Sequence, residues 1–137
     1  MRIRWPNIPH RITGEIDKGG HPWIYGNDLD RSKPDFTIHI PGKMGGNLLV
    51  MEVKAPDPTD GQIISDLRKL TAFSKYADYP FAYYLIYGLN TEAAHEFASR
   101  CRWLAGGDKR INLNLVTLFS HPEAGSLAAR VEWDHAA

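Results

Sequence analysis

Three residues in the first half of the chain are of the types that metal-assisted hydrolysis requires. Glu52 and Lys54 lie two positions apart at the end of the apolar segment NLLVMEVK, and Asp35 begins the segment DFTIHI. Side chains two positions apart in a strand project from the same face, roughly 6–7 Å apart. Glu52 follows four consecutive apolar residues, and charged groups are rarely buried without a partner. Glu52 and Lys54 are therefore either an exposed pair at a strand end or part of a site.

Asp35 can complete such a site if the two segments pair. The connecting sequence PGKMGG contains three glycines and predicts a hairpin loop. Asp35 and Glu52 each lie about six residues from this loop, so antiparallel pairing brings their carboxylates to one point. Two converging carboxylates repel each other, which raises the pKa of both. A hard divalent cation, which binds oxygen ligands, removes this repulsion when it lies between them. Lys54 beside this centre can orient or deprotonate a water molecule whose pKa the metal has lowered.

The elements that must position these residues can be predicted from hydrophobic periodicity. The segment 47–54 is apolar on both faces, which predicts a central strand that is covered on both faces. Thr59 and Gln62 fit a capping box at the start of a helix that ends near residue 76. The apolar stripe of this helix consists of Ile63, Leu67 and Leu70.

The rest of the chain supplies further strands and one more helix. The pattern predicts strands over residues 10–17, 22–26, 35–40, 81–88, 111–120 and 130–134, and a second helix over 91–105, after a cap at Asn90 or Thr91. This order predicts a single α/β domain over residues 1–137, in which helices flank a mixed central β-sheet. The aromatic residues of the strand over 81–88 are assigned mostly to the core, and stacking on nucleic-acid bases is the alternative.

Composition limits the class of protein. The chain has 137 residues, of which 43% are apolar, and its 16 basic and 16 acidic residues give a formal net charge of zero. A strongly basic nucleic-acid binder is therefore not indicated, although bound divalent cations would supply positive charge. The single cysteine, Cys101, excludes an intrachain disulfide. The chain has no apolar run of about 18 residues and no signal-peptide pattern, so we expect a cytoplasmic protein without membrane contact.

These residues and their spacing resemble a known superfamily. Pro34 and Asp35, followed after sixteen residues by Glu52, Val53 and Lys54, are similar to the signature of the PD-(D/E)XK nucleases. The resemblance covers about residues 33–88 and implies a restriction-endonuclease-like fold. It also implies that the metal ligands are Asp35, Glu52 and the backbone carbonyl of Val53, and that Lys54 positions the attacking water. Because all these ligands are oxygen atoms, Mg²⁺ is the expected cofactor, with Mn²⁺ as a substitute.

The resemblance also implies an acidic residue upstream of Asp35. Glu15 is the best match for this additional metal ligand, with Asp17 and Asp28 as alternatives. Arg68 and Lys69 are candidates for contact with nucleic acid along the first helix, although a solvated helix face explains them equally well.

The expected function is hydrolysis of phosphodiester bonds in nucleic acid, with DNA as the expected substrate and a homodimer as the expected assembly. The enzyme would be a Mg²⁺-dependent endonuclease or exonuclease. One alternative is a non-catalytic module on the same fold that binds nucleic acid or a protein. A further alternative is a different metal hydrolase that uses the same carboxylates.

Overall fold

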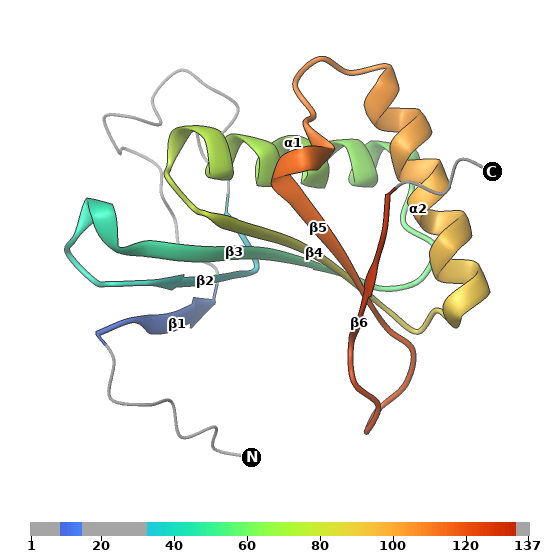
Figure 1. Ribbon diagram of the computed structural model, residues 1–137, viewed down its shortest axis with the longest axis horizontal. Coiled ribbons are helices and arrows are strands. Elements are labelled where there is room, and N and C mark those ends of the chain that lie inside the picture. The colour runs from blue at the N-terminus through green and yellow to red at the C-terminus, as the bar shows by residue number, and fades with distance from the viewer. Residues whose placement is uncertain (1–8, 15–32, 134–137) are drawn as a thin grey trace.

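The computed structural model describes residues 9–14 and 33–133, which form one mixed sheet with two α-helices (Figure 1). The strands are β1 (Arg11–Gly14), β2 (Phe36–His39), β3 (Asn47–Lys54), β4 (Phe81–Tyr87), β5 (Val116–His121) and β6 (Ala129–Val131). The helices are α1 (Asp60–Tyr76) and α2 (Thr91–Gly106), with short 3-10 helices η1 (Met44–Gly46) and η2 (Leu113–Leu115). The predicted α/β class with a mixed sheet and flanking helices is confirmed. No helix in the described ranges is long and apolar enough to cross a membrane.

Both helices pack on the same face of the sheet. The strands lie side by side in sequence order, and only the pairs β3–β4 and β4–β5 are parallel. Parallel neighbours require crossover connections, which α1 and α2 provide. Two right-handed crossovers that advance in the same direction place both helices on one face. Tyr84 of β4 reaches both of them, because its hydroxyl bonds Asp66 in α1 and its ring lies 5.9 Å from that of Phe97 in α2.

The core lies between this face and the two helices. The apolar stripe of α1 is fully buried, and it faces buried side chains of the central strands. Burying a side chain of this size stabilises the fold by roughly 1.5–3 kcal/mol. The stripe therefore holds α1 in a fixed position over β3 and β4. The side chains with 0% exposure include Ile63, Leu67, Leu70 and Phe73 of α1, and Val50, Tyr84, Ile86 and Leu118 of the sheet.

The start of α1 is fixed by the predicted capping box. Thr59 Oγ1 accepts a hydrogen bond from the backbone N–H of Gln62 at 3.2 Å, and Gln62 Oε1 accepts one from the N–H of Thr59 at 2.8 Å. These two bonds satisfy backbone donors that the first turn of a helix leaves without partners.

Replacing Thr59 by alanine is expected to lower the free energy of unfolding by about 1 kcal/mol, because one capping bond is lost. Ser65 is exposed in the middle of α1, so Ser65→Ala is the matched control and should change the free energy of unfolding by less than about 0.5 kcal/mol. Urea denaturation of the three proteins measures both values. Equal stabilities of Thr59→Ala and Ser65→Ala would contradict the prediction.

The structure differs from the predicted elements at the fifth strand. The first half of the predicted strand over 111–120 is wrong, since η2 occupies Leu113–Leu115 and β5 begins only at Val116. The side chain of Asn112 accepts a hydrogen bond from the N–H of Asn114 at 3.1 Å. Such a local bond competes with strand pairing and turns the backbone. The predicted strand over 22–26 lies outside the described residues.

Gly88 follows β4 and contacts the loop that follows β3. Its φ of +80° is in the left-handed region, which favours glycine. A Cβ at this position would lie 2.7 Å from Cγ of Pro56. Both the backbone angle and the close approach therefore require a residue without a side chain.

β3 is central, as predicted, because it lies between β2 and β4. Its side chains alternate, so that Val50 and Glu52 are buried under α1 while Met51 and Val53 project to the opposite face. Among the described elements, α1 and α2 cover only one of these faces (Figure 1). We expected both faces of β3 to be covered. The described residues cover one of them, the face that carries Val50 and Glu52.

Candidate active site

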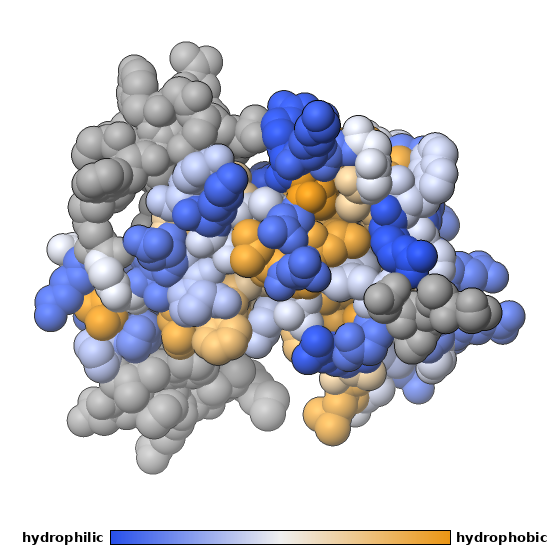
Figure 2. All heavy atoms as spheres, turned by 45° about the horizontal axis from the view of Figure 1, so that its top comes forward, coloured by the Kyte–Doolittle hydropathy of each residue, from blue (hydrophilic) through white to orange (hydrophobic). Residues whose placement is uncertain are grey.

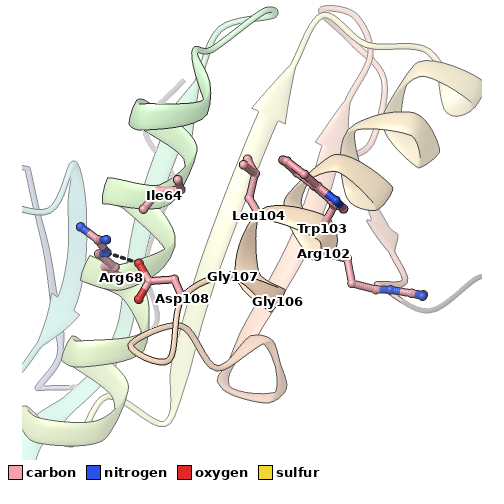
Figure 3. Close-up of a pocket in the computed structure, with 8 residues that line it drawn as sticks. All are labelled: Ile64, Arg68, Arg102, Trp103, Leu104, Gly106, Gly107 and Asp108. Atoms are coloured by element: carbon pink, nitrogen blue, oxygen red, sulfur yellow. Dashed lines mark hydrogen bonds and ion pairs between the residues drawn. The ribbon is translucent and has the colours of Figure 1, made fainter.

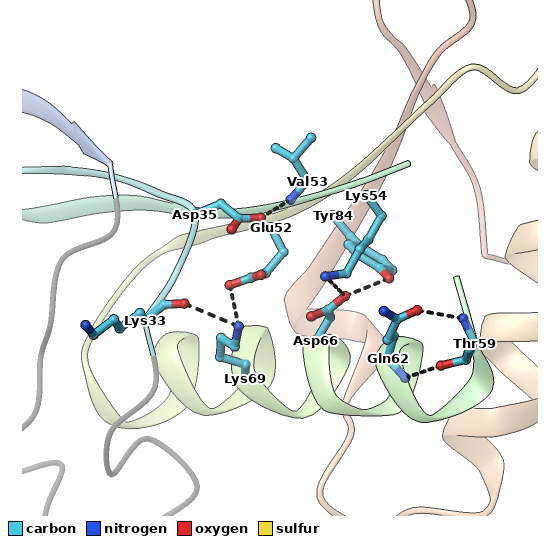
Figure 4. A network of polar contacts seen from close by, with 10 residues as sticks. All are labelled: Lys33, Asp35, Glu52, Val53, Lys54, Thr59, Gln62, Asp66, Lys69 and Tyr84. Carbon is cyan, nitrogen blue, oxygen red and sulfur yellow. Dashed lines mark hydrogen bonds and ion pairs between the residues drawn. The ribbon is translucent and has the colours of Figure 1, made fainter. Parts of the chain in front are cut away.

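The register of β2 and β3 brings Asp35 and Glu52 together. Phe36 pairs with Met51 in the antiparallel ladder, so one further step places Asp35 opposite Glu52. The backbone N–H of Val53 donates a hydrogen bond to Oδ2 of Asp35 at 2.8 Å. This bond fixes the carboxylate of Asp35 beside the end of β3, where Glu52 and Lys54 project (Figure 4).

Glu52 is a buried acid with an elevated pKa. Its exposed fraction is 1%, and burial raises the pKa of its carboxyl to about 7. The nearby ammonium of Lys69 opposes this rise, and the charges of Asp35 and Asp66 add to it. Nζ of Lys69 lies 3.0 Å from Oε1 of Glu52. The two groups form an ion pair, but Oε1 has no partner with hydrogen-bond geometry among the described residues.

Lys54 forms a second ion pair beside the first. Its Nζ lies 3.3 Å from Oδ2 of Asp66 in α1, and the hydroxyl of Tyr84 donates to the same oxygen at 3.0 Å. Asp66 is 3% exposed, and burial raises the pKa of its carboxyl, although Lys54 opposes the rise. The side chain of Lys54 keeps 26% of its surface exposed, so it is only partly buried.

The two ion pairs join β3 to α1 because the spacing of the charged residues on the strand matches their spacing on the helix. Asp66 and Lys69 are three residues apart on α1 and therefore lie on the same side of the helix. They meet Lys54 and Glu52, which lie two residues apart on the facing side of β3. Lys69 Nζ also donates to the backbone carbonyl of Lys33 at 3.3 Å. We name the group in Figure 4 that consists of Asp35, Glu52, Lys54, Asp66 and Lys69 the β3–α1 cluster.

Asp66 is the member of this cluster that the sequence analysis missed. It lies three residues after Ile63 and four before Leu70, so it falls on the buried stripe of α1 rather than on its solvent side. A charged residue within an apolar stripe is a signal for a buried partner. Lys69, a candidate for contact with nucleic acid, reaches Glu52 inside the cluster.

No family model, curated protein or solved structure matches this chain. The chemistry of the cluster therefore follows from its own atoms and surroundings.

The described residues do not by themselves provide a full set of side-chain ligands for a metal ion. Within them, no three His, Cys, Asp or Glu side chains are grouped closely enough to hold a metal ion. The N–H and C=O groups of one residue in a strand point toward the same neighbour. The Val53 carbonyl is thus directed to the side of β3 where Asp35 lies. The expected additional ligand, Glu15, and the alternatives Asp17 and Asp28 lie outside the described residues.

This donor set is compatible with a hard divalent cation. The available groups are two carboxylates and a backbone carbonyl, which are the oxygen ligands that Mg²⁺ and Mn²⁺ prefer. The buried Oε1 of Glu52 lacks a hydrogen-bond partner among the described residues. A bound cation would supply the positive charge that this oxygen now receives from Lys69.

Arg68 lies at a different place from Lys69. It lines a pocket of about 670 Å³ between α1 and the end of α2, together with Ile64, Leu104 and exposed Trp103 (Figure 3). Its guanidinium is paired with Asp108 on the rim of this pocket. Figure 2 shows hydrophobic groups near the centre of the helix-bearing surface, surrounded by hydrophilic ones. The pocket contains no member of the β3–α1 cluster.

Proposed function

We propose that this chain is a metal-dependent nuclease of the PD-(D/E)XK type, with a restriction-endonuclease-like fold and DNA as its substrate. The observation that supports this most is the position of Asp35, Glu52 and Lys54 on one face of two paired strands. A buried acid with a raised pKa, next to a second acid and a partly exposed lysine, is unusual in a purely structural site.

Asp35, Glu52 and the carbonyl of Val53 would hold the metal ion. When bound there, Mg²⁺ or Mn²⁺ would polarise a phosphate and lower the pKa of a coordinated water molecule. The protein contributes the fixed position of the ligands. Asp35 is oriented by the N–H of Val53 at 2.8 Å, and Glu52 is oriented by burial under α1.

Lys54 would place a water molecule for attack and offset the negative charge of the phosphate. Its ammonium is anchored by Asp66, which the hydroxyl of Tyr84 in turn orients. An ammonium that is already held at the site loses little freedom in the transition state. The positive charge required for nucleic acid would thus be concentrated at the site, which is compatible with a net charge of zero.

Cleavage assays with the full chain test this proposal. Supercoiled plasmid, single-stranded DNA and RNA would be incubated with Mg²⁺ or Mn²⁺, and with EDTA as the control. We expect cleavage of DNA that requires the metal and stops in EDTA. If none of the substrates is cleaved with either metal, the proposed activity is wrong.

A second candidate function is a non-catalytic module on the same fold, which binds nucleic acid or a protein. It is favoured by the fact that Glu52 and Lys54 are both engaged in ion pairs within the chain. In this case the cluster would only join β3 to α1. Retention of labelled DNA in a mobility-shift assay, without any cleavage in the presence of Mn²⁺, would support this alternative.

Asp66 is expected to act as a positioning residue for Lys54. Asp66→Asn keeps the size of the side chain but removes its charge, so we expect the cleavage rate to fall about 10- to 100-fold, as for residues that orient metal-site groups. The pH–rate profile should also shift, because asparagine removes the carboxyl of Asp66, whose pKa burial raises. Asp60→Asn is a matched control, since Asp60 lies in the same helix but pairs with exposed Arg100. A pH–rate profile of Asp66→Asn identical to that of the parent would contradict this role.

A further inference from the structure

The face of the sheet opposite the helices is apolar over most of its area. Side chains alternate along each strand, so the residues between the buried positions of β2 to β5 share this second face. No described helix or strand lies over it. We name it the open face; its residues in these strands are Phe36, Ile38, Leu49, Met51, Val53, Phe81, Tyr83, Leu85, Tyr87, Thr117, Phe119 and His121.

The centre of the open face is a row of aromatic rings in contact. The ring centroids of Phe81 and Tyr83 lie 6.1 Å apart, and those of Tyr83 and Phe119 lie 4.9 Å apart. Phe36, Phe81 and Tyr87 are 45%, 47% and 46% exposed. The assignment of the aromatic residues of β4 mostly to the core is therefore wrong for Phe81 and Tyr87.

The open face carries almost no charge. Within the described strands, its one formally charged residue is Arg130 of β6, which lies beside Phe119. Nε of Arg130 is 3.0 Å from Oε1 of Glu132, so its charge is compensated locally. A surface that binds single-stranded nucleic acid combines aromatic rings with cations for the phosphates. The open face provides the rings without such cations.

We propose that the open face binds a second copy of this chain, so that two sheets pack face to face in a symmetric dimer. The parallel strands β3 to β5 belong to a type of sheet that is normally covered on both faces. An apolar, uncharged surface is complementary to itself. Because the net charge of the chain is zero, two copies do not repel each other.

The area of the open face reaches the minimum for a specific pair. The six strands contain 32 residues, each covering about 3.3 by 4.8 Å of the sheet, which gives roughly 500 Å² per copy. Two copies would thus bury roughly 1,000 Å², which is the least area expected of a specific interface. Aromatic residues are the side chains that contribute most to such interfaces.

This dimer does not depend on the proposed nuclease activity. The β3–α1 cluster lies on the helix-covered face, so it remains accessible when the open faces are joined. The two clusters would lie on opposite outer sides of the dimer. Loss of the dimer and loss of cleavage are therefore separate outcomes.

Sedimentation equilibrium of the full chain over a wide range of concentrations tests the proposal. We expect a species with twice the mass of one chain. Phe81→Asp and Tyr87→Asp change opposite ends of β4, and each should raise the dissociation constant at least about thirtyfold. Trp103→Asp is the matched control, because Trp103 is 78% exposed on α2 and should not affect association. Circular dichroism establishes which variants keep the fold; if Phe81→Asp unfolds, Tyr87→Asp carries the same test.

Several results would overturn the dimer. A monomeric parent chain at every concentration would do so, as would equal weakening by Trp103→Asp and Phe81→Asp. A monomer that binds single-stranded DNA, and loses this binding in Tyr87→Asp, would assign the open face to nucleic acid instead.

Discussion

Replacing Glu52 by glutamine is expected to lower the rate of metal-dependent DNA cleavage at least about 100-fold, the loss typical of removing one group that stabilises charge in a transition state. Glutamine has nearly the same volume as glutamate but cannot carry the negative charge that a cation requires. The substitution also removes a buried carboxylate, so the fold should be retained. Lys54→Met is expected to cause a comparable loss by removing the ammonium next to Asp66.

Matched substitutions separate this effect from a general loss of charge. Glu96 is exposed on α2 and Lys75 is exposed near the end of α1, so Glu96→Gln and Lys75→Met should leave the rate unchanged. Initial rates on supercoiled plasmid under saturating Mn²⁺ give the comparison. Cleavage that persists in both Glu52→Gln and Lys54→Met would show that a contaminating nuclease is responsible.

The stability of the protein is expected to fall as the pH rises from about 4.5 to about 7, the ordinary and the folded-state pKa of Glu52. In this range the folded protein holds a proton on Glu52 that the unfolded chain has released. Folding therefore takes up a proton, and raising the pH opposes it. The resulting loss is about 3 kcal/mol in the free energy of unfolding, and it is complete above pH 7.

Urea denaturation at a series of pH values measures this dependence. Other groups titrate in the same range, so the difference between the parent and Glu52→Gln isolates the contribution of Glu52. The free energy of unfolding of Glu52→Gln should change less with pH in this range than that of the parent. The free energy of unfolding of Glu96→Gln should change with pH as that of the parent does. Parallel curves for the parent and Glu52→Gln would show that burial does not perturb this carboxyl.

A divalent cation should reverse the loss at high pH. A ligand that binds only the folded state stabilises it by about 2.7 kcal/mol at a concentration of 100 times its Kd. We expect Mn²⁺ to raise the Tm above pH 7, where Glu52 is charged, and to have little effect near pH 4.5. The same increase in Glu52→Gln would place the Mn²⁺ at another location.

Local signals in the sequence predicted β3 and α1 well. The apolar run of β3 and the capping box of Thr59 and Gln62 depend on neighbouring residues, which a single sequence contains. Counting residues outward from the hairpin loop was sufficient to place Asp35 opposite Glu52. η2 was missed because the bond between Asn112 and the N–H of Asn114 overrides an alternating pattern.

The ion pairs of the cluster could not be predicted in the same way. They depend on how deeply α1 lies over β3, which is set by the packing of the whole apolar stripe. Asp66 and Lys69 are separated from Glu52 by a loop, and no local pattern relates them. The continuous apolar run of β3 indicated that both of its faces avoid water, but it does not specify what covers the second face.

The position of Lys54 in the cluster depends on Gly88, which is distant in the sequence. Gly88 lies 34 positions after Lys54 in the chain, yet any side chain at this position would push against Pro56, two residues beyond Lys54. The chain can leave β3 along its observed path only because residue 88 has no Cβ atom to collide with Pro56. In a random mutagenesis screen for inactive variants, position 88 would be recovered alongside the acids and the lysine, although it contributes no chemical group to them.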